Sequence, residues 1–257
     1  MSEFQEVTSD MPEANLPCIS ILIPCWRRRK FIPLILTNIL NQDYPKEKIE
    51  LVILQDGDQD LFIDDKRKEL FIASLGNVKL NYKYEPNHRR TIGEKRNLLV
   101  KMATHKICAM MDSDDIYLET YLRYSVNALH QYKAGITSSN SMLFVYPKDE
   151  FKMSAISCDY KHMCHEACAV FTKKYFKSLG GFSKSSQGEG VKMFQGSDNK
   201  IVNLDISKLM VCVCHTGEEG NTIDKAQFEE QNKNIATFED GCWKTILQNI
   251  LEISAKV

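Results

Sequence analysis

Residues 106–115 (KICAMMDSDD) join a short apolar run directly to three carboxylates. An apolar run of this length, followed by polar residues, is typical of a buried strand in a parallel sheet. Three neighbouring Asp side chains repel one another unless a cation neutralises them, and their oxygens suit Mg²⁺ or Mn²⁺. An acidic turn that caps the next helix is the alternative. The stretch therefore predicts a strand whose carboxyl end carries a concentrated negative charge.

Strand and helix signals alternate on both sides of this stretch. Apolar runs predict strands, and apolar residues spaced three and four apart predict helices. The sequence Thr91-Ile92-Gly93-Glu94 fits a capping box, which marks the first turn of a helix. The expected strands cover residues 18–24, 50–55, 78–84 and 106–111, and the expected helices cover 32–40, 64–74, a segment from 91 and 118–129. This order predicts an α/β fold with a Rossmann-like, mostly parallel central sheet and helices on both faces.

The pattern is less regular in the second half of the chain. Residues 136–146 and 201–214 are β-like, residues 165–179 run from a strand into a short helix, and residues 183–190 form a Ser/Gly-rich loop. Residues 222–257 predict a long amphipathic helix or a pair of helices. We expect a solvated tail at residues 1–17 and one domain at 18–257. Its nucleotide-binding half covers 18–115, and its acceptor half with the C-terminal helix covers 116–257.

The charge balance limits the kinds of partner. The 257 residues contain 33 Lys and Arg against 34 Asp and Glu, a net charge of −1, which argues against nucleic acid as a partner. No apolar run approaches the roughly 20 residues that a transmembrane helix needs. The first 17 residues contain no Lys or Arg, unlike a secretory signal. With nine cysteines and no signal peptide, we expect reduced thiols in a soluble, cytoplasmic protein.

Several cysteines and histidines gather in the second half, and zinc is one interpretation of them. The residues concerned are His162, Cys164, His165, Cys168, Cys212, Cys214 and His215. No pair of Cys-x-x-Cys motifs is present, and Cys212 and Cys214 alternate in an apolar run as buried strand residues do. Core cysteines are therefore favoured over a structural zinc site.

Basic residues follow the predicted strands at the edge where the carboxylates lie. They occur in residues 26–30 (WRRRK), in 88–90 (HRR) and at Lys95 and Arg96. A pyrophosphate needs cations and its metal needs carboxylates, although each basic run alone could be a solvated face. The chain has no G-x-x-x-x-G-K-[ST] motif, which excludes a P-loop. Residues 25–29 contain no glycine, so neither a dinucleotide fingerprint nor the Gly-rich turn of sugar nucleotidyltransferases follows the first strand.

Four segments, in their order and spacing, resemble the inverting glycosyltransferases of family 2, which have the GT-A fold. They are residues 19–27 (ISILIPCWR), 50–60 (ELVILQDGDQD), 93–97 (GEKRN) and 110–115 (MMDSDD), and the likeness extends over about residues 18–222. The resemblance implies that Asp112 and Asp114 form a DXD motif with ribose and metal contacts. It also implies a set of nucleotide-binding residues: Pro24, Cys25, Trp26, Arg27, Asp56, Asp58, Arg90, Gly93, Arg96, Asp112 and Ser113.

The catalytic base is harder to place by resemblance. Leu179-Gly180-Gly181-Phe182 matches the GGF turn of the family, which usually carries an Asp or Glu base further on, within an acidic "ED" pair. Here that pair reads Glu189-Gly190, so Glu189 is the implied base, with Glu166 and Asp198 as the next candidates. His215 resembles a late histidine that joins Asp112 and Asp114 in the metal site of some GT-A enzymes; a core or surface histidine is the alternative.

The resemblance implies a metal-dependent inverting glycosyltransferase of class EC 2.4, either hexosyl- or pentosyltransferase. It would use Mn²⁺ or Mg²⁺ to move a sugar from a nucleotide-diphosphate sugar to a hydroxyl of a glycan, glycoprotein or other acceptor. A sugar nucleotidyltransferase of related fold and a non-catalytic nucleotide- or zinc-binding module are the alternatives. The apolar stripe of the C-terminal helix predicts core packing, with an oligomer contact as the other interpretation. The stripe consists of Trp243, Ile246, Leu247, Ile250 and Leu251.

Overall fold

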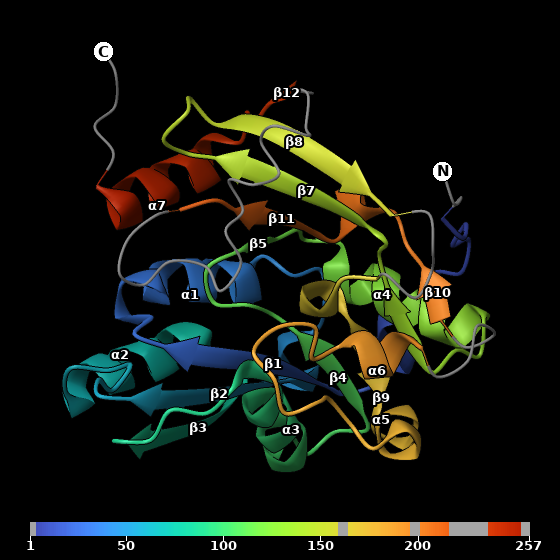
Figure 1. Cartoon of the computed structure of the whole chain (residues 1–257), viewed down its shortest axis with the longest axis horizontal. Helices are drawn as coiled ribbons and strands as arrows, with labels where there is room; N and C mark the ends of the chain where they lie inside the picture. The colour runs from blue at the N-terminus through green and yellow to red at the C-terminus, as the bar shows by residue number, and fades with distance from the viewer. Residues whose placement is uncertain (1–3, 159–163, 196–200, 216–235, 253–257) are drawn as a thin grey trace.

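The computed structural model describes residues 4–158, 164–195, 201–215 and 236–252. Its elements form a central sheet with a second, smaller sheet stacked beyond helix α1 (Figure 1). The strands of the central sheet are β1 (Ile19–Trp26), β2 (Ile49–Gly57), β3 (Lys79–Pro86), β4 (Ile107–Met110), β6 (Ile136–Ser138), β9 (Val170–Thr172) and β10 (Ile201–Asn203). The helices are α1 (Ile32–Leu40), α2 (Asp65–Leu75), α3 (Ile92–Met102), α4 (Tyr121–Gln131), α5 (Lys173–Leu179), α6 (Val191–Phe194) and α7 (Gly241–Leu251).

The central sheet has the order β10-β6-β9-β4-β1-β2-β3. Its pairings are parallel except those of β9, which runs antiparallel to both β4 and β6. β1 is flanked by β2 and β4, with Leu22 opposite Val52 on one side and Met110 on the other. The carboxyl ends of β1, β2 and β4 therefore lie at one edge, where a mostly parallel sheet binds its ligands. The predicted α/β architecture is confirmed.

Helices cover both faces of this sheet because the side chains of each strand alternate in direction. Ile21 and Ile23 of β1 belong to a core cluster that includes residues of α1, α2 and α4. Leu22, between them, belongs to a different cluster, which α3 and α5 complete. Both sets of strand residues are fully buried. The continuous apolar runs in the sequence are thus explained by burial on two sides.

Local signals in the sequence start the helices where they were expected. Thr91 and Glu94 form the predicted capping box, so α3 begins at Ile92 and carries Lys95 and Arg96 in its first two turns. Asp64 caps α2 by accepting a hydrogen bond from the backbone amide of Arg67. The start of α3 matters most for the site, because it fixes where these two cations point.

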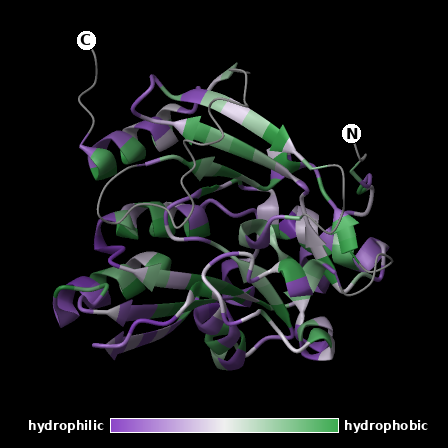
Figure 2. Ribbon diagram, viewed as in Figure 1, coloured by the Kyte–Doolittle hydropathy of each residue, from purple (hydrophilic) through white to green (hydrophobic). Residues whose placement is uncertain are grey.

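The second sheet has the order β12-β8-β7-β11-β5. Its strands are β5 (Ile116–Tyr117), β7 (Ser141–Tyr146), β8 (Lys152–Ser157), β11 (Met210–Val213) and β12 (Ala236–Thr237). Hydrophobic colour runs along β7 and β11 in Figure 2. Buried residues of these two strands pack with α1 and α7 in a third core cluster. The β-like segments 136–146 and 201–214 thus each divide between the two sheets.

Where the sequence predicts a long amphipathic helix or a pair of helices at 222–257, the described residues form a short strand and one helix. Residues 236–237 form β12, and α7 begins only at Gly241, where Asp240 caps it through the amides of Cys242 and Trp243. Residues 222–235 lie outside the described residues. Trp243, Leu247 and Ile250 are buried in the third core cluster. Three residues of the apolar stripe of α7 therefore pack inside the fold, while Ile246 and Leu251 are partly exposed, and an oligomer contact through this helix stays a prediction.

The described part of the N-terminal segment, for which the sequence predicts a solvated tail, contacts the rest of the fold. The backbone amides of Thr8 and Ser9 donate to Gln131 at the end of α4, and Gln5 pairs with Asn203 of β10. Leu16 is buried in the main core cluster. The acidic side chains face solvent while the backbone and the apolar residues hold the segment in place.

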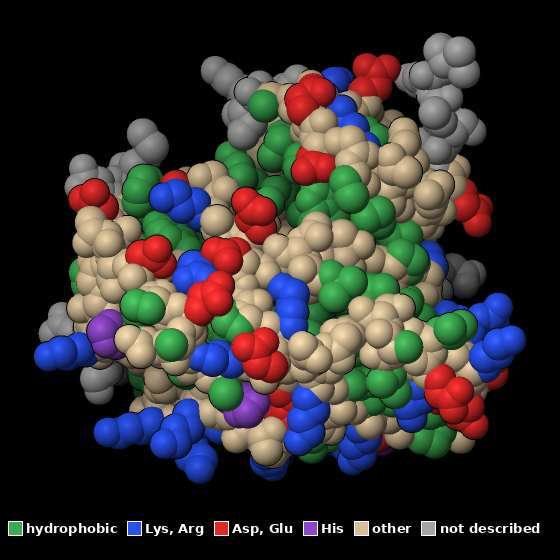
Figure 3. Space-filling model, turned by 180° about the vertical axis from the view of Figure 1, so that it is seen from behind, with side chains coloured by type: hydrophobic (Ala, Val, Ile, Leu, Met, Phe, Trp, Pro, Cys, Tyr) green, Lys and Arg blue, Asp and Glu red, His purple; other side chains and the backbone are tan. Residues whose placement is uncertain are grey.

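Positive and negative side chains are interspersed on the face turned away in Figure 1, as Figure 3 shows. This mixture agrees with the net charge of −1. Within the described residues, no helix is long and apolar enough to cross a membrane.

Candidate functional site

The loop after β4 connects the acidic stretch to the rest of the domain. The backbone amide of Asp112 donates a hydrogen bond to the hydroxyl of Tyr117, at 2.7 Å. The carboxylate of Asp115 accepts from the amide of Val213 in β11, at 2.8 Å, and its carbonyl accepts from Asn38. Asp115 thus joins the two sheets, which leaves Asp112 and Asp114 to face the edge of the central sheet.

Asp114 lies between two nitrogen-bearing side chains. Its Oδ2 atom is 3.0 Å from Nε2 of His215 and 3.1 Å from Nη2 of Arg28, and its side chain is 10% exposed. The ring of His215 packs against Phe31, with 5.1 Å between ring centroids. The Nδ1 atom of His215 is buried without a hydrogen-bond partner among the described residues. The expected pairing of Asp114 with a late histidine is therefore present in the fold.

Asp112 is directed differently. Its carboxylate accepts from Nη2 of Arg96 at 3.2 Å, and 27% of its side chain is exposed. In the parts of the chain that the structure describes, no three His, Cys, Asp or Glu side chains converge as a metal site. The predicted trio of Asp112, Asp114 and His215 is thus brought together only as the pair Asp114–His215. A carboxylate beside an imidazole is a donor set that suits Mn²⁺, so these two residues fit a divalent metal.

The contacts of the Cys and His side chains can be compared with the zinc interpretation. His165 contacts the thiol of Cys212 at 3.4 Å, and Cys168 contacts Ser138. All nine cysteines are free thiols, five of them buried, while His162 lies outside the described residues. Core packing accounts for Cys164, Cys168 and Cys212, the buried cysteines of this group.

Asp56 ends β2 in a buried, positively charged environment. Its Oδ1 lies 2.5 Å from Nζ of Lys95, and its Oδ2 accepts from the amide of Arg90 at 2.7 Å. Burial lowers the pKa of Lys95, although the Asp56 carboxylate opposes this. The side chain of Arg90 pairs with Glu85, the carboxylate at the end of β3. Asp56 is thus a fixed acceptor at the sheet edge, with Lys95 holding it from α3.

Aromatic and cationic groups lie beside Asp56. Trp26 is its register partner at the end of β1, and the guanidinium of Arg89 lies 3.7 Å from the centre of the indole ring. Arg27 donates two hydrogen bonds to the carboxylate of Asp58, of 3.0 and 2.5 Å. Gly57, at φ +94°, lies so close to Trp26 that a Cβ atom there would be 2.9 Å from the indole. This indole forms a flat surface at the sheet edge.

Three predicted residues contribute through the backbone or through packing. Cys25 is fully buried, and this burial raises the pKa of its thiol to about 12, although Lys95, Arg28 and Ser113 oppose the rise. Pro24 pairs with Leu54 inside the sheet, and Ser113 is buried beside Cys25. A nucleotide contact by these three residues stays a prediction.

Gly93 brings the Ser/Gly-rich loop against α3. Its amide donates to the carbonyl of Ser185 at 2.8 Å, and an added Cβ would come 1.8 Å from the carbonyl oxygen of Ser183. The position therefore accepts no side chain. In the structure its amide is committed to this loop, so a nucleotide contact by Gly93 stays a prediction.

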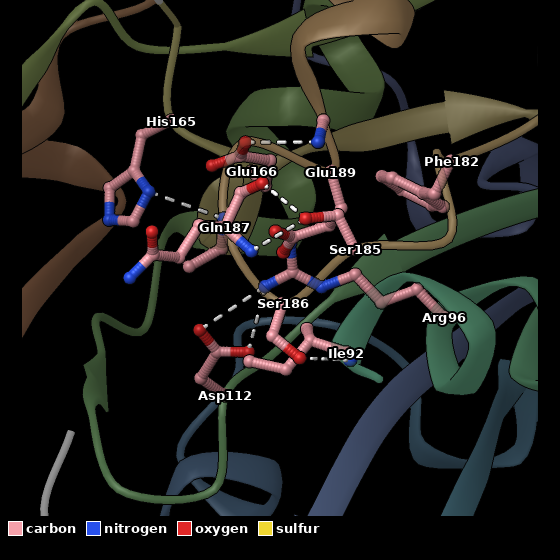
Figure 4. A network of polar contacts seen from close by, with 12 residues as sticks. Ile92, Arg96, Asp112, His165, Glu166, Phe182, Ser185, Ser186, Gln187 and Glu189 are labelled. Carbon is pink, nitrogen blue, oxygen red and sulfur yellow. Dashed lines mark hydrogen bonds and ion pairs between the residues drawn. The ribbon is translucent and has the colours of Figure 1, made fainter. Parts of the chain in front are cut away.

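Arg96 is the centre of the network in Figure 4. It is buried, and its guanidinium contacts Asp112 at 3.2 Å and Glu189 at 2.5 Å. Burial opposes the charge of Arg96, but the carboxylates of Asp112, Glu189 and Glu166 outweigh it and hold the pKa of the guanidinium above its ordinary value. Its Nε atom has no hydrogen-bond partner among the described residues. An unsatisfied buried donor beside Asp112 suits an anionic ligand.

Glu189 and Glu166 are the acidic residues on the far side of Arg96. Burial raises the pKa of Glu189, although Arg96 opposes the rise. Glu166 accepts from the amide of Gly190 at 3.1 Å. Asp198, the third candidate base, lies outside the described residues. In the sequence Arg28 and Lys95 appeared only as members of basic groups, and Tyr117 was not singled out, because their contacts depend on the folding of distant segments.

The fold and this arrangement agree with the family comparison. The model of glycosyl transferase family 2 matches residues 20–180, more than half of the chain. The chain belongs to glycosyltransferase family 2. The matched segment contains Asp56, Arg96, Asp112 and Asp114, whereas Glu189 and His215 lie beyond it.

Solved structures place the fold in the GT-A class. The mannosyltransferase PcManGT from Pyrobaculum calidifontis, in complex with GDP-Man and Mn²⁺, superimposes with a TM-score of 0.61 and 18% identity, over 84% of this chain and 62% of that chain. TarS 1–349 from Staphylococcus aureus, in complex with UDP-GlcNAc, gives 0.61 and 18%, over 78% and 60%. At such identities the likeness establishes the fold alone.

Curated relatives are longer than this chain. An uncharacterized glycosyltransferase from Rickettsia felis is 22% identical over 254 residues, which is 92% of this chain but 39% of that protein. The poly(ribitol-phosphate) beta-N-acetylglucosaminyltransferase TarS from S. aureus is 30% identical over 98 residues, 37% of this chain and 16% of that protein. The chain thus spans well under half the length of the curated relatives it matches.

Proposed function

We propose that this family 2 domain transfers a sugar from a nucleotide-diphosphate sugar to a hydroxyl acceptor, with inversion at the anomeric carbon and with a divalent metal. The observation that carries the proposal is the arrangement around Asp114. A buried carboxylate beside His215 and Arg28 lies at the same sheet edge as Asp112 and Arg96. The complexes of related fold with GDP-Man and Mn²⁺ and with UDP-GlcNAc support this class of donor.

The nucleotide would lie across the ends of β1 and β2. Asp56 offers a carboxylate that its ion pair with Lys95 holds in place, suited to accept an N–H of the base. Trp26 supplies an aromatic surface next to it. Asp112 would contact the ribose. The unsatisfied Nε of Arg96 would donate to the diphosphate, where charge develops as the bond to the sugar breaks.

Asp114 and His215 would hold Mn²⁺ or Mg²⁺. A metal bound there supplies Lewis-acid stabilisation of the leaving diphosphate. Arg28, already within hydrogen-bond distance of Asp114, adds a second positive charge on the same side. The residues around Asp114 therefore stabilise the leaving group, and the residues beyond Arg96 are left to activate the acceptor.

The acceptor hydroxyl would approach from the side of the Ser/Gly-rich loop. A single displacement inverts the anomeric carbon, and it needs a base to take the proton of the attacking hydroxyl. Glu189 is the base that the sequence predicts, and Glu166 is a second carboxylate in the same network. Whether a hexose or a pentose is transferred would depend on the shape of the pocket between these groups.

Binding of UDP and GDP with and without Mn²⁺ tests the proposal. We expect Mn²⁺ to strengthen nucleoside diphosphate binding at least tenfold in calorimetry, because the cation links the carboxylates to the phosphates. Asp114→Ala should remove this enhancement and abolish turnover while the fold persists, since one fewer carboxylate relieves repulsion. The exposed Asp149, replaced by Ala, is the control. Equal nucleotide affinity with Mn²⁺ and with a chelator would contradict the proposal.

A further inference from the structure

Gly190 occupies the place where the family usually has the second acidic residue of its pair, and its environment explains the glycine. Its φ is −82°, a conformation open to any residue, so backbone freedom does not require glycine here. Space does. A Cβ at position 190 would come 1.8 Å from Cγ of Glu166 and 2.6 Å from its Oε1. The carboxylate side chain of Glu166 therefore fills the volume that a side chain at position 190 would occupy.

Glu166 is held there by its neighbours. Its Oε1 accepts from the amide of Gly190 at 3.1 Å, and Figure 4 shows its other oxygen turned away from that amide. No ion pair to Glu166 is found among the described residues, and the residue is partly exposed. One carboxylate oxygen thus fixes the group, while the second is available to a ligand.

The turn that carries Glu166 is tied to the acidic loop after β4. Tyr117 donates its hydroxyl hydrogen to the carbonyl of Ala167 at 2.8 Å and accepts from the amide of Asp112 at 2.7 Å. Tyr117 is completely buried. The side chain of Tyr117 therefore fixes the distance between the backbone segments that carry Glu166 and Asp112. A catalytic group that acts on the bound donor needs such a fixed position.

Glu189 has a different environment. Its carboxylate is buried and forms a 2.5 Å ion pair with Arg96, which Asp112 contacts from the other side. A carboxylate engaged in this way balances the charge of a buried guanidinium, and its removal would leave Arg96 only the longer ion pair, to Asp112, among the described residues. Glu189 therefore suits the positioning of Arg96 better than proton transfer.

We propose that Glu166 is the carboxylate that activates the acceptor, in place of a side chain at position 190, and that Glu189 positions Arg96. The assignment rests on the proposed transferase function. In the step, the acceptor oxygen bonds to the anomeric carbon, and the bond from that carbon to the diphosphate oxygen breaks with its electron pair leaving on the diphosphate. The acceptor proton passes to Glu166. Atoms and charge balance without a further reactant.

The test compares Glu166→Gln with Glu189→Gln. A panel of UDP- and GDP-sugars with Mn²⁺ is screened for release of nucleoside diphosphate, with water as the acceptor. We expect Glu166→Gln to lower the rate by about 100- to 10,000-fold, the usual worth of general-base catalysis. Its donor affinity in calorimetry should stay within about twofold of wild type. Glu189→Gln should instead weaken donor binding, because Arg96 loses the shorter of its two ion pairs.

Two further variants separate catalysis from structure. Azide is a nucleophile without a proton to lose, so it should restore nucleoside diphosphate release to Glu166→Ala and leave Glu189→Gln unimproved. Glu166→Ala/Gly190→Asp moves the carboxylate to position 190, and its rate should be at least tenfold higher than that of Glu166→Ala. Glu166→Ala/Gly190→Asn should show no such increase. Recovery in the Asp variant alone would show that the chemistry needs a carboxylate in this volume.

The outcomes distinguish the assignment from the function on which it rests. Wild-type turnover together with a near-normal rate in Glu166→Gln would overturn the role of Glu166 only. A large rate loss in Glu189→Gln that azide rescues would give the role to Glu189. If the wild-type chain neither binds nor cleaves any sugar nucleotide of the panel, the proposed function fails, and the assignment fails with it.

Discussion

Single residues at this site derive their roles from contacts across the fold. Asp112 and Asp114 were recognisable in the sequence because three carboxylates at a strand end are unusual without a cation. Glu166 could not be assigned in the same way, because its position depends on the missing side chain of Gly190, 24 residues later. Arg28 appeared only as one member of a basic run. Its partner Asp114 lies 86 residues away, and the fold alone brings the two together.

In the proposed metal site, Arg28 would compete with the cation for Asp114. Its guanidinium lies 3.1 Å from the same oxygen that faces His215. Arg28→Met should therefore raise the affinity for Mn²⁺ in the absence of nucleotide by roughly three- to tenfold, because an ion pair and a repelling charge are both removed. The same variant should bind nucleoside diphosphate more weakly, since a phosphate-side cation is lost.

Electron paramagnetic resonance of free Mn²⁺ measures the first effect, and calorimetry measures the second. Arg27→Met is a matched control, because Arg27 pairs with Asp58 at a distance from Asp114. An unchanged or weaker Mn²⁺ affinity in Arg28→Met would show that the cation does not bind at Asp114.

At the scale of elements, the sequence located the parts that are buried on both sides. The predicted strands at 18–24, 50–55 and 78–84 correspond to β1, β2 and β3 within one or two residues at most ends. Continuous apolar runs give that signal regardless of the partner strand. The strands of the second sheet are harder to recognise in the sequence, because they are short and some pair with segments that are far away in the chain, such as Cys212 with Phe144. Pairing of this kind is set by tertiary packing and not by local pattern.

Glu50 connects β2 to two other elements, and this connection should make stability depend on pH. Its Oε2 accepts from Ser20 of β1 at 2.6 Å and from the amide of Thr104 at 2.7 Å, and the residue is 1% exposed. Burial raises the pKa of Glu50, but these hydrogen bonds outweigh it and leave the pKa below its ordinary value. A carboxyl with a lowered folded-state pKa stabilises the fold at pH values above its unfolded pKa of about 4.3.

Glu50→Gln should therefore lower the free energy of unfolding by about 1–3 kcal/mol at pH 7, as expected for lost hydrogen bonds to a charged acceptor. The difference from wild type should shrink as the pH falls below about 4, where the wild-type carboxylate becomes protonated. Urea denaturation between pH 7 and pH 3 measures it, with the exposed Glu47→Gln as control. A difference that stays constant over this range would mean that the ionised form of Glu50 contributes nothing.

At the scale of the whole molecule, the second sheet and α7 complete the domain around the site. Phe31 belongs to the core cluster beneath α7, and its ring also packs on His215. The packing of the C-terminal helix is thus linked through one aromatic side chain to a residue proposed to hold the metal. The sequence predicted a core role for the stripe on this helix. It could not predict which surface the stripe would cover, because α1 precedes α7 by about two hundred residues.

Trp243 tests whether this outer layer folds together with the central sheet. The side chain is 5% exposed and packs in the cluster that includes Phe31, Leu34 and Leu247. Trp243→Ala should lower the free energy of unfolding by about 3–5 kcal/mol, the usual cost of emptying a large aromatic site. Because the cluster joins α7 to α1, unfolding should remain a single transition when tryptophan fluorescence of Trp26 and circular dichroism are compared.

Asn249→Ala, at an exposed position of the same helix, is the control and should change stability by no more than about 0.5 kcal/mol. Two separate transitions, or a loss below about 1 kcal/mol for Trp243→Ala, would show that α7 folds independently of the sheet that carries Asp56 and Asp112. The contacts of α7 with Phe31, and of Phe31 with His215, would then contribute nothing to the free energy of unfolding.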